Sequence, residues 1–183
     1  MITLRDVQPE DSEMLRTWRN LPEVAAYMYT DHEITPEEHA LWFEGMMRDD
    51  SSRYWVITLD GEDVGLLYLY DINRRHRRCY WGFYVASPKV RGRGVGSYTE
   101  YTCLRHVFDV MGFNKLCCEV LDGNQPVVDM HKKYGFQQEG YYRQHVIKGG
   151  EPKDVVALAM LKEEWEQVKP AMEARLREKG LIP

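Results

Sequence analysis

The segment Arg91-Gly92-Arg93-Gly94-Val95-Gly96 most constrains what this chain can fold into. Three glycines at alternate positions leave a loop with little side-chain bulk, so its backbone N–H groups can close around an anion. The two interleaved arginines carry guanidinium groups that suit phosphate oxygens. A strand pattern at residues 79–85 precedes the loop, and a helical pattern at residues 97–108 follows it. This succession of strand, glycine loop and helix N-terminus predicts a site for a diphosphate.

Two familiar phosphate motifs do not match this loop. A P-loop closes with Gly-Lys followed by Ser or Thr, and that ending is not present here. The dinucleotide fingerprint GxGxxG fails on spacing, because the glycines fall at positions 92, 94 and 96. It also requires a parallel βαβ unit, whereas an antiparallel meander is predicted before this loop. Taken alone, the loop leaves open a tight turn with solvated arginines.

The composition limits the class of protein and of ligand. The formal net charge of −5 argues against a general nucleic-acid binder, because a phosphate backbone demands a basic surface. With 183 residues, 44% of them hydrophobic, we expect a single domain over residues 1–183. The four cysteines lack CxxC spacing, which predicts reduced thiols and no metal site. No apolar run suits a signal peptide or a membrane span, so we expect a soluble cytoplasmic protein without a membrane partner.

Hydrophobic periodicity predicts seven strands and five helices. The strands are expected at residues 2–7, 53–59, 64–71, 79–85, 116–121, 141–147 and 155–161. The helices are expected at residues 9–20, 35–46, 97–108, 124–133 and 163–179. This order predicts an α/β (α+β) fold with a mixed, mainly antiparallel central sheet flanked by helices.

Residues 85–96, Val-Ala-Ser-Pro-Lys-Val-Arg-Gly-Arg-Gly-Val-Gly, resemble the acetyl-CoA-binding signature of the GCN5-related N-acetyltransferases. In that signature an apolar strand end and a proline precede Arg/Gln-x-x-Gly-x-Gly, and Arg91, Gly94 and Gly96 occupy its required positions. A second family block follows, with a strand at residues 116–120, then Asn124, then Gly135-Phe136. The resemblance covers nearly the whole chain and implies the GNAT fold, with the sheet split at the acetyl-CoA-binding strand.

The resemblance implies acetyl-CoA as co-substrate and assigns most of its contacts. The residues expected to hold the diphosphate are Arg91, Gly92, Arg93, Gly94, Val95, Gly96 and Ser97. Phe83, Tyr84 and Val85 would pair with the pantetheine arm and present a backbone N–H to the acetyl oxygen. Asn124 resembles the asparagine that contacts the pantetheine arm.

The chain departs from the family at the proton donor. The family often has Asn-xx-Ala-xxx-Tyr-xxx-Gly-Phe, and His131 stands here in the place of that tyrosine. A histidine can protonate a thiolate, so we predict that His131 is the general acid, with Tyr134 as the competing catalytic residue. Spacing assigns no general base; His39, Asp71, Glu119 and a water chain remain open.

The N-terminal half usually builds the acceptor pocket in this family. Here Trp18-Arg19-Asn20 and Glu38-His39-xx-Trp42-Phe43 resemble a subgroup that acetylates the 4-amino group of nucleotide-linked amino-deoxysugars, as in pseudaminic acid biosynthesis. Arg19 could pair a phosphate, Asn20 and His39 could bond sugar hydroxyls, and Trp42 offers an apolar face to a deoxysugar methyl group. The expected partner is therefore a UDP- or dTDP-linked amino sugar.

Several alternatives stay open. Trp18 and Trp42 have the helical spacing of core residues, and the basic turn at residues 74–78 is typical of a solvated hairpin tip. A protein N-terminal or aminoglycoside-type acetyltransferase would use the same scaffold. A non-enzymatic acyl-CoA sensor would keep the glycine loop without a working acid. A homodimer paired along the last strands is also left open.

Overall fold

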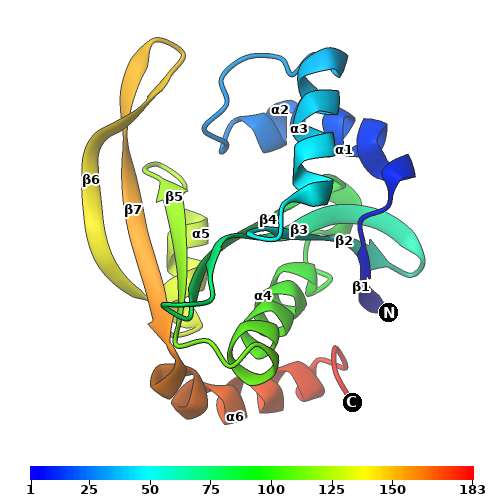
Figure 1. Ribbon diagram of the computed structural model, residues 1–183. Helices are drawn as coiled ribbons and strands as arrows, with labels where there is room; N and C mark the ends of the chain where they lie inside the picture. Colours follow the sequence, from blue (N-terminus) through cyan, green and yellow to red (C-terminus); the bar gives the residue numbers. More distant parts are fainter.

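The computed structural model describes residues 1–183 and contains one seven-stranded sheet in the order β1-β2-β3-β4-β5-β7-β6 (Figure 1). The strands are β1 (Ile2–Asp6), β2 (Arg53–Leu59), β3 (Glu62–Asn73), β4 (Arg78–Val85), β5 (Lys115–Leu121), β6 (Gln137–Lys148) and β7 (Glu151–Leu161). The helices are α1 (Ser12–Arg19), α2 (Pro22–Ala25), α3 (Pro36–Arg48), α4 (Val95–Arg105), α5 (Gln125–Lys133) and α6 (Lys162–Glu178). The predicted mixed, mainly antiparallel sheet is confirmed.

The sheet is split between its two central strands. β4 pairs with β3 in antiparallel register from Tyr80 to Val85. Its parallel pairing with β5 is confined to three residues, from Arg78 to Tyr80 opposite Lys115 to Cys117. Beyond Tyr80, β4 therefore has no strand on its β5 side, and its backbone groups there are free to bind another extended chain. The expectation of a sheet split at this strand is confirmed.

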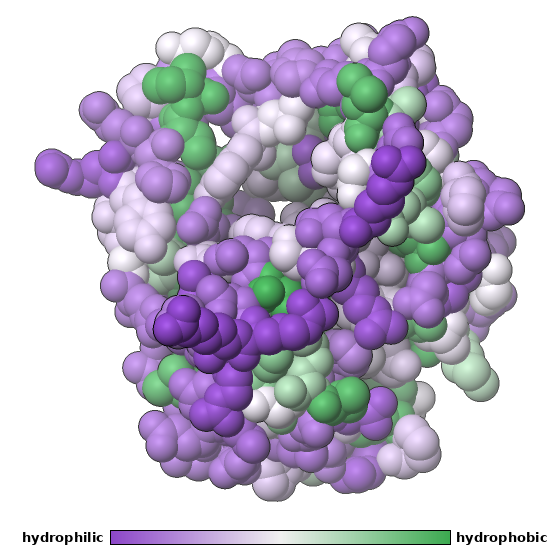
Figure 2. All heavy atoms as spheres, viewed as in Figure 1, coloured by the Kyte–Doolittle hydropathy of each residue, from purple (hydrophilic) through white to green (hydrophobic).

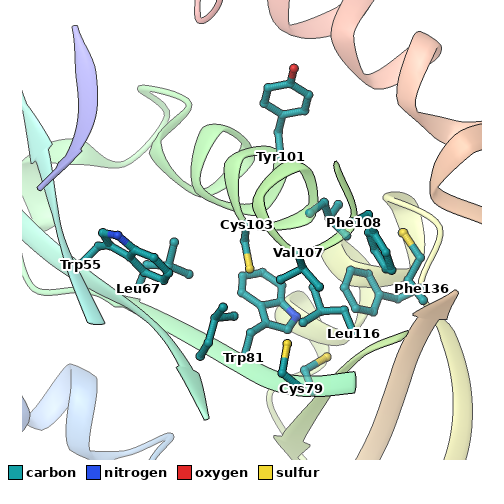
Figure 3. Close-up of a cluster of buried hydrophobic side chains, with 14 of the residues drawn as sticks. Trp55, Leu67, Cys79, Trp81, Tyr101, Cys103, Val107, Phe108, Leu116 and Phe136 are labelled. Carbon is teal, nitrogen blue, oxygen red and sulfur yellow. The ribbon is translucent and has the colours of Figure 1, made fainter. Parts of the chain in front are cut away.

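Helices cover both faces of the sheet (Figure 1). The larger core lies between the sheet and the α4, α5 and α6 layer, and Figure 3 shows Trp81, Cys103, Val107 and Phe136 packed together there. A smaller core lies under α1 to α3 on the opposite face. Side chains alternate along β4, so Trp81 and Phe83 reach the larger core while Tyr84 packs into the smaller one. One strand thus contributes side chains to the cores on both faces of the sheet.

Three local elements differ from the sequence predictions. The short helix α2 was not predicted; Pro22 begins it, because proline suits the first helical turn. The helix expected at residues 97–108 starts at Val95 and gives way to a π-turn from His106 to Val110. β6 and β7 form a longer hairpin than predicted. None of the helices combines the length and apolar character needed to cross a membrane.

Candidate active site

The glycine loop forms an open pocket at the N-terminus of α4. Gly92 and Gly94 have φ values of +76° and +79°, in the left-handed region that favours glycine. The N–H groups of Gly92, Gly94, Gly96 and Ser97 donate to no carbonyl in the protein. Unpaired N–H groups that converge at a helix N-terminus form an anion-binding cradle. The loop therefore fits the diphosphate of a coenzyme A molecule.

The two loop arginines differ in their surroundings. Arg93 donates from Nη2 to Asp60 Oδ2 at 2.8 Å, and the carboxylate of Asp60 also contacts the amino group of Met1. Arg91 is exposed and has no side-chain partner in the protein. Lys179 and Leu181, next to the C-terminus, complete the pocket wall. Arg91 is thus the loop cation that is free to meet a phosphate.

A cleft of about 290 Å³ opens where β4 and β5 diverge. Its walls include Phe83, Tyr84 and Val85 of β4 together with Asn124, which caps α5 and makes no side-chain capping bond. These are the residues predicted to meet the pantetheine arm and the acetyl group. The cleft and the glycine-loop pocket share Val85 in their walls, so the two run into one another along the same strand.

His131 also lines this cleft, although its side chain is only 5% exposed. Its ring lies against Trp81, with ring centroids 5.2 Å apart, and against Phe136, with centroids 5.3 Å apart. Its Nδ1 is 2.9 Å from Oε1 of Glu100. The other nitrogen, Nε2, has no protein partner and is not completely buried. The imidazole is therefore held by one nitrogen and offers the other to the cleft.

Tyr134, the competing acid, lies elsewhere. Its hydroxyl donates to Ser97 Oγ at 2.5 Å, which ties the end of α5 to the start of α4, and it does not line the cleft. Gly135, with φ +104°, ends α5, and the N–H of Phe136 donates to the carbonyl of His131. This glycine cap fixes the last turn of α5, which carries His131.

A second cavity, of about 230 Å³, lies between α1, α3 and the sheet, and is named the acceptor cavity here after the ligand that the sequence predicts for its residues. Arg19, His39 and Trp42 line it, so three of the four residues predicted to bind the acceptor come together. Three buried polar atoms in its walls have no partner: Arg19 Nε, His39 Nε2 and Tyr84 Oη. Buried polar groups are normally bonded, so orphans that gather around one cavity indicate a polar ligand.

The wall of this cavity combines neutral hydroxyl and imidazole groups with one cation and one carboxylate. Burial raises the pKa of Tyr54 to about 12 and raises the pKa values of Tyr68 and Tyr84, so all three hydroxyls stay protonated near neutral pH. Burial lowers the pKa of His39, which keeps its imidazole neutral. The guanidinium of Arg19 is the one cation in the wall, and its Nη2 donates to Thr30 Oγ1 at 3.3 Å. The wall's only carboxylate, Glu38, contacts His32 Nε2 at 2.9 Å.

Asn20 does not line the cavity. Its amide group donates to the carbonyl of Ile34 at 3.0 Å and accepts from the N–H of Ile34 at 2.9 Å, so both ends of the side chain hold the loop before α3. The structure thus gives Asn20 a positioning contact instead of an open one. Trp42 is 42% exposed and lies edge-on to Tyr54, whereas Trp18 packs into the smaller core. The core interpretation therefore holds for Trp18 and not for Trp42.

The three residues considered as general bases occupy different places. His39 lies in the acceptor cavity and Glu119 in the cleft, where it accepts a hydrogen bond from Tyr29 Oη at 2.7 Å. Asp71 lines neither cavity; it bonds Arg78 at 2.8 Å across a bulge at the far end of β3. Only His39 and Glu119 are placed where an amine could reach them.

Three residues at or near the two cavities were not predicted from the sequence: Tyr68, Lys148 and Glu100. Tyr68 lines both the cleft and the acceptor cavity, as does Tyr84, so these two tyrosines separate the two spaces. Lys148, at the tip of the β6–β7 hairpin, donates to one carbonyl at the end of α2 and to two in the loop that follows. Figure 2 shows the surface hollowed between this hairpin and the N-terminal helices. Glu100 was overlooked, although it continues the apolar stripe of α4.

Comparison with known proteins finds a matching family and several relatives of this chain. The acetyltransferase (GNAT) domain family matches residues 1–137. Spermidine N(1)-acetyltransferase of Escherichia coli is 24% identical over 164 residues, which covers 90% of this chain and 88% of that protein. Acetyltransferase PseH of Campylobacter jejuni is 24% identical over 131 residues, covering 72% of this chain and 80% of that protein.

The fold is shared with a solved structure of similar size. Spermidine N-acetyltransferase from Vibrio cholerae, in complex with CoA and spermine, superposes with a TM-score of 0.83 at 20% identity. The match covers 90% of this chain and 98% of that one.

Proposed function

Since the chain belongs to the acetyltransferase (GNAT) domain family and is an N-acetyltransferase, we propose that it transfers the acetyl group of acetyl-CoA to a small anionic amine. The proposed acceptor is the 4-amino group of a nucleotide-linked amino-deoxysugar. The motifs around Arg19 and His39 support this acceptor. When bound, acetyl-CoA supplies an acetyl group activated as a thioester.

The residues of the cleft would perform the transfer. The free backbone edge of β4 from Phe83 to Val85 orients the pantetheine arm and donates an N–H to the acetyl oxygen as charge develops there. Asn124 holds the arm from the opposite side. His131 Nε2 provides the proton for the departing sulfur. Glu119 and His39 are the groups able to receive a proton from the amine.

One observation carries the acceptor proposal: the acceptor cavity has one cation, Arg19, whose Nε is buried and unpartnered. A guanidinium with an open N–H suits a phosphate or carboxylate oxygen. The neutral hydroxyls and imidazole around it suit sugar hydroxyls. At about 230 Å³ the cavity is smaller than a typical pocket for a drug-sized ligand, so it fits one sugar ring while the nucleotide extends into the hollow of Figure 2.

A polyamine is the second candidate, and a separate feature favours it. Glu23 and Glu119 both line the β4–β5 cleft, where carboxylates would attract a protonated amine. The spermidine acetyltransferases among the relatives support this alternative. The two candidates differ in the residue they need, because the sugar depends on Arg19 and the polyamine on the two glutamates.

A coupled-thiol assay with several acceptor classes tests the proposal. The panel comprises UDP- and dTDP-4-amino sugars, spermidine, an aminoglycoside and a peptide with a free N-terminus. We expect turnover with a nucleotide amino sugar, and a KM for it that rises about 10- to 100-fold in Arg19→Ala, because a hydrogen bond to a charged group is lost. The KM for acetyl-CoA should stay unchanged.

Arg48→Ala is the matched control, because Arg48 sits on α3 outside the cavity and pairs only with Glu44. If spermidine is the only acceptor turned over, and this activity is lost in Glu119→Gln but kept in Arg19→Ala, the acceptor is a polyamine and the sugar proposal fails. Turnover confined to the aminoglycoside or the peptide would refute both acceptors.

A further inference from the structure

Glu100 is a buried carboxyl group to which the transfer described above gives no task. It lies on α4 with none of its side chain exposed. Its Oε1 is 2.9 Å from His131 Nδ1, and its Oε2 has no partner in the protein. Burying a carboxyl group is unfavourable unless it is paired, so its presence in the main core calls for a function.

No other charge compensates this carboxyl group. The titratable groups that face it are the thiols of Cys103 on α4 and Cys118 on β5, and burial raises the pKa of each, so both remain neutral. Trp81 of β4 and Phe136, between α5 and β6, pack against His131 and carry no charge. Thr99, next to Glu100, is also fully buried and neutral. His131 is therefore the only group able to balance a charge on Glu100.

Because no other charge lies near Glu100 and His131, the net charge of this pair determines where its protons sit. Burial raises the pKa of Glu100, and the hydrogen bond from His131 opposes that effect. With one proton between Oε1 and Nδ1 and a second on Nε2, the pair is neutral overall. With Nε2 deprotonated, the pair carries a net negative charge in a site without a cation. The low-dielectric core favours the neutral form. Within that form a proton on Oε2 of Glu100 would have no acceptor, so the second proton belongs on Nε2, facing the cleft.

We propose that Glu100 is a positioning residue that orients His131 and keeps the transferable proton on Nε2. This inference rests on the proposed acetyl transfer. In that reaction the amine nitrogen forms a bond to the acetyl carbon while the carbon–sulfur bond breaks. The sulfur keeps the electron pair and takes the proton from Nε2, and the amine loses one proton to a base or to water. The pair regains its proton from solvent before the next cycle.

The test compares Glu100→Gln with the wild-type protein in pH–rate profiles. Glutamine preserves the size of the side chain and removes its charge. We expect kcat near neutral pH to fall at least tenfold, and at most by the about 10²–10⁴-fold that general acid–base catalysis supplies. The basic limb of the profile should move to lower pH, because the carboxylate partner of the imidazole is removed. The KM for acetyl-CoA should not change.

Thr99→Val is the matched control, because it alters an equally buried polar side chain on the same turn and should leave kcat and the profile as in the wild type. A Glu100→Gln profile that coincides with the wild-type profile would overturn the proposal.

Nitrogen-15 NMR of the histidines in the wild-type protein provides a readout that does not depend on the variant folding or on turnover. We expect Nε2 of His131 to be protonated at neutral pH, and an unprotonated Nε2 would also overturn the proposal. If no acceptor is acetylated while Nε2 is protonated, the proposed function fails and the Glu100–His131 pairing stands.

Discussion

Gly94 is subject to two separate constraints, one from its own backbone and one from the C-terminal tail. Its φ of +79° is strained for any other residue, and an added Cβ would lie 2.5 Å from Leu181 Cδ1. The left-handed conformation alone destabilises a non-glycine residue by about 1–2 kcal/mol. We expect Gly94→Ala to lose more than this in urea unfolding, because the side chain of Leu181 must also shift. The KM for acetyl-CoA should rise, since the loop N–H groups shift with Gly94.

Gly92→Ala separates the two constraints. Gly92 has a similar φ of +76°, but nothing lies within 4 Å of its added Cβ. It should therefore show the backbone effect without the contact with the tail, and Leu181→Ala should recover part of the loss in Gly94→Ala. Equal losses in Gly92→Ala and Gly94→Ala would contradict a role for the tail contact.

At the residue scale, the sequence was most informative where a residue's neighbours lie on its own helix. His39 and Trp42 are three apart on α3, so helical spacing alone places them on one face, and both line the acceptor cavity. Asn20 was read as an open ligand because its partner Ile34, in a loop fourteen residues later, follows no regular spacing. Glu100 carried a usable signal, since Thr99, Cys103 and Leu104 mark the same buried stripe.

At the scale of elements, Lys148 joins two segments that are more than a hundred residues apart in sequence. Its Nζ donates to the carbonyls of Ala25, Met28 and Thr30 at 2.8–3.0 Å, and so fastens the hairpin tip to the loop after α2. Lys148→Met keeps much of the side chain's apolar length and removes the three donors. We expect faster hydrogen exchange at residues 25–31 and a KM for the acceptor that rises several-fold, because that loop borders the acceptor cavity.

Lys153→Met is the control on the same hairpin, since Lys153 pairs only with Glu151 at 2.7 Å. It should leave the exchange rates and the acceptor KM unchanged. Unaltered exchange at residues 25–31 in Lys148→Met would show that the clamp does not order the loop.

Elements with their own start and stop signals were predicted well. The helices expected at residues 35–46 and 124–133 match α3 and α5 closely. Thr35 caps α3 by accepting from the N–H of Glu38, and Gly135 ends α5. The extra length of β6 could not be predicted, because most of its residues are exposed and its apolar pattern is weak. Its pairing partner is β7, and backbone pairing needs no particular side chain.

At the scale of the whole molecule, two histidines set the pH dependence of stability below neutrality. Burial lowers the pKa values of His39 and His106, and for His106 the charges of Arg53 and Arg105 add to the effect. An unfolded histidine titrates near about 6.5. As the pH falls through that value, the unfolded chain binds protons at these positions before the folded chain does. The free energy of unfolding should therefore fall between about pH 7 and pH 5.

The double variant His39→Gln/His106→Gln should flatten this decline in urea unfolding curves. The raised pKa of Glu100 acts in the opposite direction, and it is common to both proteins, so it cancels in the comparison. His76→Gln, in the exposed basic turn, is the control and should keep the wild-type decline. A double variant that declines as steeply as the wild type would show that these histidines do not determine the pH dependence.

Coenzyme A should stabilise the whole chain, because its proposed site draws on segments from β4 to the C-terminus. A ligand at 100 times its Kd adds about 2.7 kcal/mol, which corresponds to a Tm increase of about 5–10 °C for a protein of this size. Arg91 and Arg93 provide a matched pair. We expect Arg91→Ala to lose much of the increase, because its guanidinium is free to bind phosphate, whereas Arg93 is already bound to Asp60. Thermal unfolding with and without coenzyme A measures both, and a larger loss in Arg93→Ala would reverse the assignment.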